Sequence, residues 1–236
     1  MTRSDALAAI TNEIVECRAC PRLVAWREAV ACEKRAAFRN EDYWGRPVPA
    51  FGDPAARVLV LGLAPAAHGG NRTGRIFTGD RSGDWLFRAL HATGFANQPT
   101  SVHAGDGLAL RDVYIAAAVR CAPPENRPTT DERDRCLPYL ARELDALTQV
   151  GVVVVLGAFA YEAAWKVLTD RGDSLPRPRP RFTHGLEVVT PRVAILGCYH
   201  PSQENTFTGR LTVSMLEGVF ARARAVAGLE PADHSH

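Results

Sequence analysis

Four of the six cysteines are spaced in a way that suits a metal centre. Cys17 and Cys20 form a C-x-x-C pair, Cys121 follows an apolar run, and Cys136 lies further along the chain. Four thiolates can hold a zinc ion or a [4Fe–4S] cluster. One close pair of cysteines with two distant ones is a loose pattern that a larger cluster could bridge. The spacing alone does not decide between zinc and an iron–sulfur cluster.

Two other segments carry side chains that could act on a substrate. Residues 62–80 are rich in glycine and contain Phe77 and Asp80, and residues 198–208 contain His200. Glycines let a backbone approach a ligand closely. Neither G-x-G-x-x-G nor G-x-x-x-x-G-K-[ST] occurs here, so a nucleotide phosphate cradle is not indicated.

The elements that must position these side chains follow an alternating pattern. Short apolar runs are typical of buried parallel strands, and they occur at 57–63, 113–119, 152–156 and 193–197. Helical patterns occur at 4–15, 24–38, 83–93, 129–147, 158–169 and 208–225. This alternation predicts an α/β fold with three α/β/α layers and a central, mainly parallel four-stranded sheet. We expect a single domain over 1–228 and a disordered tail over 229–236.

Ligands of parallel α/β sheets bind beyond the carboxyl ends of the strands. That rule selects three loops, at 62–80, 119–128 and 198–208, which are also the loops of unusual sequence. Asp80 is in addition a suitable N-cap for the helix that follows it. The proline- and arginine-rich residues 171–183 cannot form a core and are expected to be a surface loop or arm.

Composition restricts the class of protein only in part. The net charge is +2, and all but two of the 28 basic residues are arginines. Arginine suits bidentate phosphate contacts, although a GC-rich genome would explain the bias equally well. No apolar run approaches the ~20 residues of a membrane helix, and the first residues lack a signal-peptide core. We therefore expect a cytoplasmic monomer without membrane contact or a disulfide framework, in which Cys32 and Cys198 are ordinary thiols.

Three motifs, in order along the chain, resemble those of one enzyme family. They are GLAPAAHGGNRTGRIFTGD at 62–80, RCAPPEN at 120–126 and YHPSQENT at 199–206. Together they are similar to the active-site motifs of the iron–sulfur uracil-DNA glycosylases of family 5. In the related family 4, an acidic residue stands at the position of Ala64 and an asparagine at that of Ala117. Both polar groups are missing here, which favours family 5 and suggests a base site tolerant of other deaminated bases.

The resemblance implies a uracil-DNA glycosylase fold, a DNA partner and a set of roles. Cys17, Cys20, Cys121 and Cys136 would hold a structural [4Fe–4S] cluster. The catalytic residues would be Asp80, near the sugar, and His200, donating to the leaving base. The base would contact Gly62, Ala64, Phe77, Asn126 and His200. The DNA would contact Arg72, Arg75, Ser202, Gln203, Asn205 and Arg210, and residues 203–210 would supply the wedge that enters the duplex.

The chemistry required is base excision. The target nucleotide must leave the stack, and the transition state places positive charge on the sugar and negative charge on the departing base. No lysine stands in a motif loop, so we expect a monofunctional glycosylase that releases uracil, and hypoxanthine as well. One alternative is a non-catalytic iron–sulfur module that binds nucleic acid. Another is a hydrolase using His200 with Ser202, although no G-x-S-x-G elbow occurs.

Overall fold

The computed structural model describes residues 2–230. Six strands form one sheet in the order β1-β3-β2-β4-β6-β5. The strands are β1 (Phe51–Gly52), β2 (Val58–Gly62), β3 (Val113–Ala117), β4 (Val152–Leu156), β5 (Glu187–Val189) and β6 (Ala194–Cys198). The helices are α1 (Arg3–Val15), α2 (Pro21–Glu33), α3 (Gly70–Thr73), α4 (Arg81–Ala92), α5 (Thr130–Ala146), α6 (Ala158–Asp170), α7 (Gln203–Phe207) and α8 (Val213–Val226), with short 3-10 turns η1 (Ala36–Phe38) and η2 (Pro124–Asn126).

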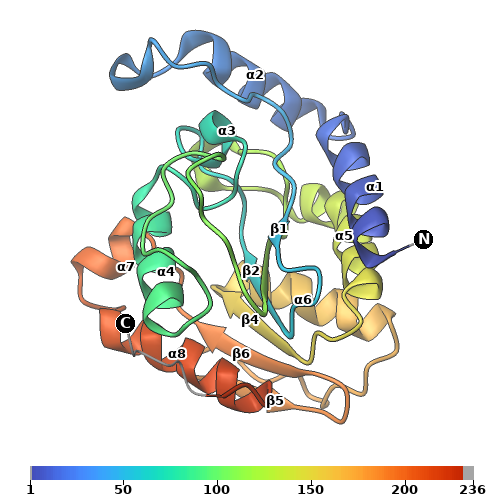
Figure 1. Cartoon of the computed structure of the whole chain (residues 1–236). Coiled ribbons are helices and arrows are strands. Elements are labelled where there is room, and N and C mark those ends of the chain that lie inside the picture. The colour runs from blue at the N-terminus through green and yellow to red at the C-terminus, as the bar shows by residue number, and fades with distance from the viewer. Residues whose placement is uncertain (1, 231–236) are drawn as a thin grey trace.

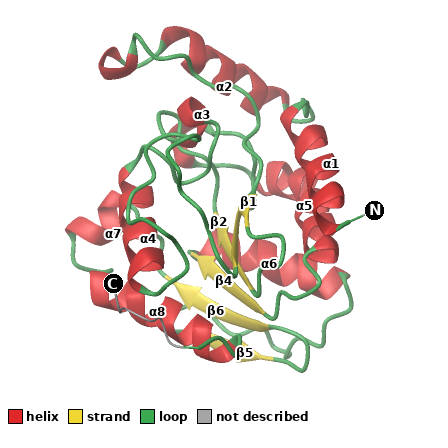
Figure 2. Cartoon of the chain, in the orientation of Figure 1, coloured by secondary structure: helices red, strands yellow, loops and turns green. Residues whose placement is uncertain are grey.

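The predicted three-layer fold with four central parallel strands is confirmed. β3, β2, β4 and β6 pair in parallel, and every residue of these strands is buried. Helices α4 and α8 pack with the core on one face of the sheet, and α1, α5 and α6 pack with the core on the other. The strands lie between the two sets of helices (Figure 1, Figure 2).

Two short edge strands were not predicted. β1 and β5 pair antiparallel to β3 and β6 and close the two edges of the sheet. β1 has only two residues, and β5 alternates between exposed and buried side chains, so neither produces the apolar run by which a buried strand is recognised.

Several helix boundaries differ from the predicted ones. The helix predicted over 24–38 ends at Glu33, because Lys34 adopts a positive φ of 53°. The helix predicted from 208 begins at Val213, where the Thr212 hydroxyl accepts a hydrogen bond from the backbone of Met215. Before it, the short helix α7 is stopped by Gly209, whose φ is 71°.

The end of the predicted domain is only partly described. Leu229 packs against the core beside α8, and the Glu230 carbonyl accepts from Arg224. The remaining residues of the predicted tail, 231–236, lie outside the described residues. Within residues 2–230, no helix has the length and apolar character needed to cross a membrane.

Candidate active site and cysteine centre

The loops that carry the motifs meet at one edge of the sheet. β2, β3 and β6 end at Gly62, Ala117 and Cys198, and the strands run parallel. The loops that follow them therefore emerge from the same edge, as the sequence predicted. Gly157, directly after β4, also belongs to this edge.

Phe77 lies where two of these segments touch. Its φ is 53°, its side chain is only 6% exposed, and its ring lies 6.0 Å from the ring of His200 with an angle of 34° between the planes. A Cβ on Gly62 would come within 2.7 Å of the Phe77 ring. Any side chain larger than hydrogen at position 62 would therefore displace the ring. Phe77 packs with the core, and its role as a stacking face for a base stays a prediction.

Asp80 caps the helix that follows it, as predicted. Its Oδ1 accepts a hydrogen bond of 3.0 Å from the backbone N–H of Gly83, the N3 position of α4. The other carboxylate oxygen lies against the backbone of Gly69, where a Cβ would collide with it. Burial raises the pKa of Asp80, and the backbone donors of Gly83 and Ser82 oppose that shift. The result is a carboxylate held rigidly at the edge of the sheet.

His200 comes from the loop after β6, which is separated from β2 in the sheet by β4. Burial lowers the pKa of its imidazole to about 4, so the ring is neutral near pH 7. The side-chain amide of Asn205 donates to the His200 carbonyl at 2.9 Å, and the Ser202 hydroxyl accepts from the Asn205 backbone at 3.4 Å as the cap of α7. A neutral imidazole can donate one N–H without carrying charge.

Two arginines that the sequence assigned to DNA are used inside the protein. The Arg75 guanidinium is buried and forms a bidentate pair with Asp106, with further bonds to Thr78 and Ser101. The DNA contact of Arg75 stays a prediction, and in this structure its donors are bonded to other residues of the protein. Arg72 likewise donates to the backbone of His68 and Gly79 and pairs with Glu41.

Other predicted contacts are placed differently. Asn126 is exposed in the turn η2 with a φ of 56°, and no hydrogen bond or ring contact among the described residues joins it to Phe77 or His200. Ala64 packs beside the buried cysteines. Gln203 is exposed at the start of α7, and Arg210 is exposed with its guanidinium 4.5 Å from the centre of the Tyr199 ring. Gln203 and Arg210 therefore remain open to a ligand.

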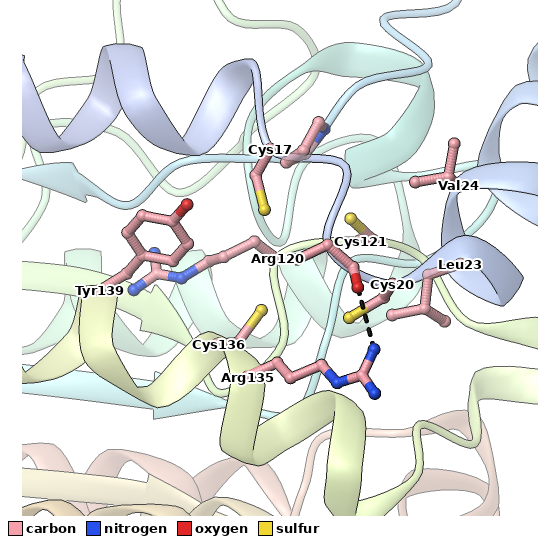
Figure 3. A pocket seen from close by; sticks show the side chains of 11 residues that line it. Cys17, Cys20, Leu23, Val24, Arg120, Cys121, Arg135, Cys136 and Tyr139 are labelled. Carbon is pink, nitrogen blue, oxygen red and sulfur yellow. Dashed lines mark hydrogen bonds between the residues drawn. The ribbon is translucent and has the colours of Figure 1, made fainter.

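The four predicted ligand cysteines face one cavity. Cys20, Cys121 and Cys136 are buried, and Cys17 is partly exposed. In Figure 3 their sulfurs point toward a common space that Arg120, Arg135 and Tyr139 help to enclose. The Arg135 guanidinium donates to the Ala19 carbonyl at 3.0 Å and closes the loop between the two N-terminal cysteines.

The four cysteines around the cavity form a donor set that can be compared with the needs of an ion and of a cluster. Within residues 2–230, no three His, Cys, Asp or Glu side chains are grouped closely enough to hold one metal ion. A zinc ion gathers four sulfurs about one point at ~2.3 Å, whereas a four-iron cluster takes one thiolate at each iron and spreads them. Four cysteines around a shared cavity fit the cluster better. Cys32 is exposed and Cys198 lies in the core near α8, and neither lines this cavity.

A buried arginine lies beside the cysteines, and its positive charge would balance the negative charge of metal-bound thiolates. Arg27 is 2% exposed, and its guanidinium donates to the Cys121 sulfur at 3.0 Å and to the Cys17 carbonyl at 3.3 Å. Burial raises the pKa of Cys121 to about 11 and that of Cys136 to about 12. With neutral thiols, Arg27 would keep only the partly exposed Glu28, at 3.7 Å, as counter-ion. Metal-bound thiolates would neutralise it, because an unpaired buried charge is costly.

Sequence reasoning missed Arg27, Gly83 and Phe207. Arg27 follows the C-x-x-C pair on an otherwise buried helix face, a signal that marks a buried cation. A Cβ on Gly83 would collide with the Phe77 carbonyl, and no local pattern reveals such a contact. Phe207 is 67% exposed at the end of α7, and its exposure emerges only from the folded loop.

Together these features define an α/β enzyme whose site lies at the carboxyl edge of its sheet. Its side chains are a rigid buried carboxylate, a neutral imidazole and an aromatic ring. The family model of the uracil-DNA glycosylase superfamily matches residues 49–224. The chain belongs to this superfamily and, within it, to the type-5 family.

Three similar relatives carry the same description, type-5 uracil-DNA glycosylase. That of Mycobacterium tuberculosis is 54% identical over 91% of this chain and 79% of the relative. That of Mycobacterium leprae is 51% identical over 96% of this chain and 98% of the relative. That of Thermus thermophilus is 49% identical over 94% of this chain and 98% of the relative. The resemblance inferred from the three motifs is confirmed.

Proposed function

We propose that the chain hydrolyses the N-glycosidic bond of uracil in DNA and leaves an abasic site. The similar relatives are named for uracil excision. The observation that carries the proposal is the meeting of Asp80, Phe77 and His200 at one edge of the sheet. All three come from the same chain, so a monomer suffices for the site.

The mechanism follows from the charges that develop in the reaction. Once the nucleotide is flipped out, the bond between the base nitrogen and C1′ breaks and its electron pair leaves with the base. Water adds to C1′. The Asp80 carboxylate stabilises the positive sugar and orients that water, and the neutral His200 imidazole donates to an oxygen of the departing base. Because Gly62 has no Cβ, the Phe77 ring can pack against the end of β2.

The range of bases extends beyond uracil in this proposal. Ala64 and Ala117 offer no polar side chain to read the base edge, so discrimination against hypoxanthine is weak. Chromatography of free base released from duplexes with one uracil or one hypoxanthine tests both statements. Release of uracil with none of hypoxanthine would contradict the broad range. Binding without release of either would support a non-catalytic DNA-binding module instead.

The chain also holds a [4Fe–4S] cluster in this proposal, on Cys17, Cys20, Cys121 and Cys136. What supports it is the cavity that the four cysteines line together and the buried Arg27 beside Cys121. The cluster would serve as a structural cross-link, since base excision needs no electron transfer. These cysteines would tie the N-terminal helices to the loop after β3 and to α5.

Replacing Cys136 by Ser tests the cluster directly. We expect purified wild-type protein to be brown, with a broad absorption shoulder near roughly 400 nm, and Cys136→Ser to lose most of it together with thermal stability. Iron and sulfide analysis gives the stoichiometry. Cys32→Ser is the matched control, because Cys32 is exposed and away from the cavity, and it should keep the full absorption. A colourless wild-type protein containing zinc would contradict the proposal.

Phe207 is proposed as the wedge that fills the gap left by the flipped nucleotide. Its ring is 67% exposed, lies in the segment predicted to enter the duplex, and is covered on one side by the Arg81 guanidinium at 4.7 Å. Arg81 directly follows Asp80, so the ring stands near the catalytic carboxylate. Apolar side chains are commonly inserted between unstacked bases.

For Phe207→Ala we expect excision from duplex DNA to fall by about 10- to 100-fold, since unstacking costs a few kcal/mol. Excision from single-stranded DNA, which needs no gap filled, should change little. Single-turnover rates on the two substrates give this ratio. Val189→Ala is the control, because Val189 is 66% exposed on the edge strand β5. Equal loss on both substrates would show that Phe207 is not the wedge.

A further inference from the structure

We propose that residues 176–182, which we name the arginine–proline arm, bind the phosphate backbone of duplex DNA beside the excision site. The contact would be independent of sequence and of the damaged base. It rests on the proposed function in that DNA is the substrate, and it adds a second, separate binding surface to the site. The residues that carry it are Arg177, Arg179 and Arg181.

The arm presents cations that no carboxylate of residues 2–230 pairs with, although the Arg179 guanidinium also lies 5.8 Å from the centre of the Tyr161 ring. Arg177, Arg179 and Arg181 alternate with prolines and are all exposed. None of the three forms an ion pair with any Asp or Glu of residues 2–230, whereas most other arginines of the described chain do. An exposed cation without a carboxylate partner is free to contact phosphate, for which the planar guanidinium is well suited.

The buried carboxylate nearest along the chain does not neutralise the arm. Asp173 faces Arg171 and Arg192, which lie 3.9 and 3.6 Å from its oxygens. Prolines also restrict the backbone to few conformations. The backbone that carries the arginines is therefore restricted before a ligand arrives, and less backbone entropy is lost on binding.

The arm is fixed to the core at its second half. The Tyr161 hydroxyl donates to the Pro180 carbonyl at 2.9 Å, and its ring lies 5.8 Å from that of Phe182. The next residue, Thr183, passes so close to β6 that a Cβ on Gly197 would come within 2.6 Å of its carbonyl. These contacts attach the arm to the carboxyl end of β6.

That attachment brings the arm beside the catalytic loop. The Phe182 ring lies 6.4 Å from the ring of Tyr199, which directly precedes His200. The Arg210 guanidinium covers the same Tyr199 ring. Tyr199 is thus flanked by two segments with exposed arginines, the arm and the residues after α7. A polyanion bound at His200 would lie next to both, which favours the DNA backbone as the ligand.

The test compares two triple variants of equal charge change. One is Arg177→Gln/Arg179→Gln/Arg181→Gln. The control is Arg3→Gln/Arg57→Gln/Arg111→Gln, all exposed. Arg57 and Arg111 precede the amino ends of β2 and β3, away from the carboxyl ends where the site lies. Arg3 is at the first turn of α1, and Cys17 follows the other end of that helix. Fluorescence anisotropy measures the affinity of each for a fluorescent undamaged duplex across a range of salt concentrations.

We expect the arm variant to bind about 10- to 100-fold more weakly at low salt. Its slope of log affinity against log salt should fall by about 2 to 3, at ~0.9 per lost phosphate contact. Single-turnover excision at saturating DNA should stay at the wild-type rate. A slope equal to that of the control would overturn the arm proposal while leaving uracil excision intact. Loss of excision at saturation in the arm variant, with wild-type binding, would overturn it as well.

Discussion

Asp80→Asn is expected to excise uracil about 100- to 10,000-fold more slowly than the wild-type chain. The Asp80 carboxylate is held at the carboxyl edge of the sheet against Gly69, three residues after Phe77. Without its charge, neither the positive sugar nor the attacking water is stabilised. Single-turnover kinetics on a duplex with one uracil measures the loss.

The choice of Asn separates catalysis from folding. Asp80 also caps α4 through the Gly83 N–H, and Asn caps helices as well as Asp does. The thermal midpoint of Asp80→Asn should therefore stay within a few degrees of wild type. Asp80→Ala, which loses both functions, should be less stable by about 1 kcal/mol. Wild-type excision by Asp80→Asn would leave the carboxylate with a structural role alone.

His200→Phe is expected to lower the excision rate by about 100- to 1,000-fold, the usual effect of losing one donor to a developing anion. Phe keeps a planar ring beside Phe77 and suits the buried position, so folding should be preserved. His200→Gln, whose amide also donates, should recover part of the rate. Equal rates for the Phe and Gln variants would show that donation to the base is not the role of His200.

The neutral state of His200 gives this site a distinctive pH profile. Because burial lowers the pKa of His200 to about 4, kcat/KM should not titrate near pH 6.5, the ordinary histidine value. Instead, the rate should fall on acidification as Asp80, whose pKa burial raises above 3.8, takes up a proton. A rate that falls as pH rises through 6 to 7 would indicate a cationic histidine and contradict the mechanism.

The buried part of the fold could be predicted from local sequence, and its edges could not. Five-residue apolar runs such as Val152–Leu156 are typical of a strand that is buried on both faces. β1 was missed because Phe51–Gly52 is stabilised by pairing with Ile115 and Tyr114, residues distant along the chain. α7 was missed because five residues show little periodicity.

The site divides in the same way. Which loops meet was predictable, since parallel strands place their carboxyl ends together. The contacts of individual side chains were not predictable, because their partners are far apart in the sequence. Arg75 is of a residue type that often binds phosphate, but its guanidinium forms an ion pair with Asp106. The position of Arg27 on a buried helix face marks a buried cation, but nothing local shows that its partner is Cys121. Both contacts exist only in the folded chain.

The most direct test of the account is cleavage of an end-labelled duplex bearing one uracil opposite guanine, analysed with and without alkali. We expect a shortened strand only after alkali, since the enzyme leaves an intact backbone with an abasic site. At an early time point, Asp80→Asn should give at least about 100-fold less product than the wild-type chain. Bound DNA that gives no alkali-labile product, from protein with its cysteine centre intact, would contradict it. That outcome would leave a protein that binds DNA without excising the base.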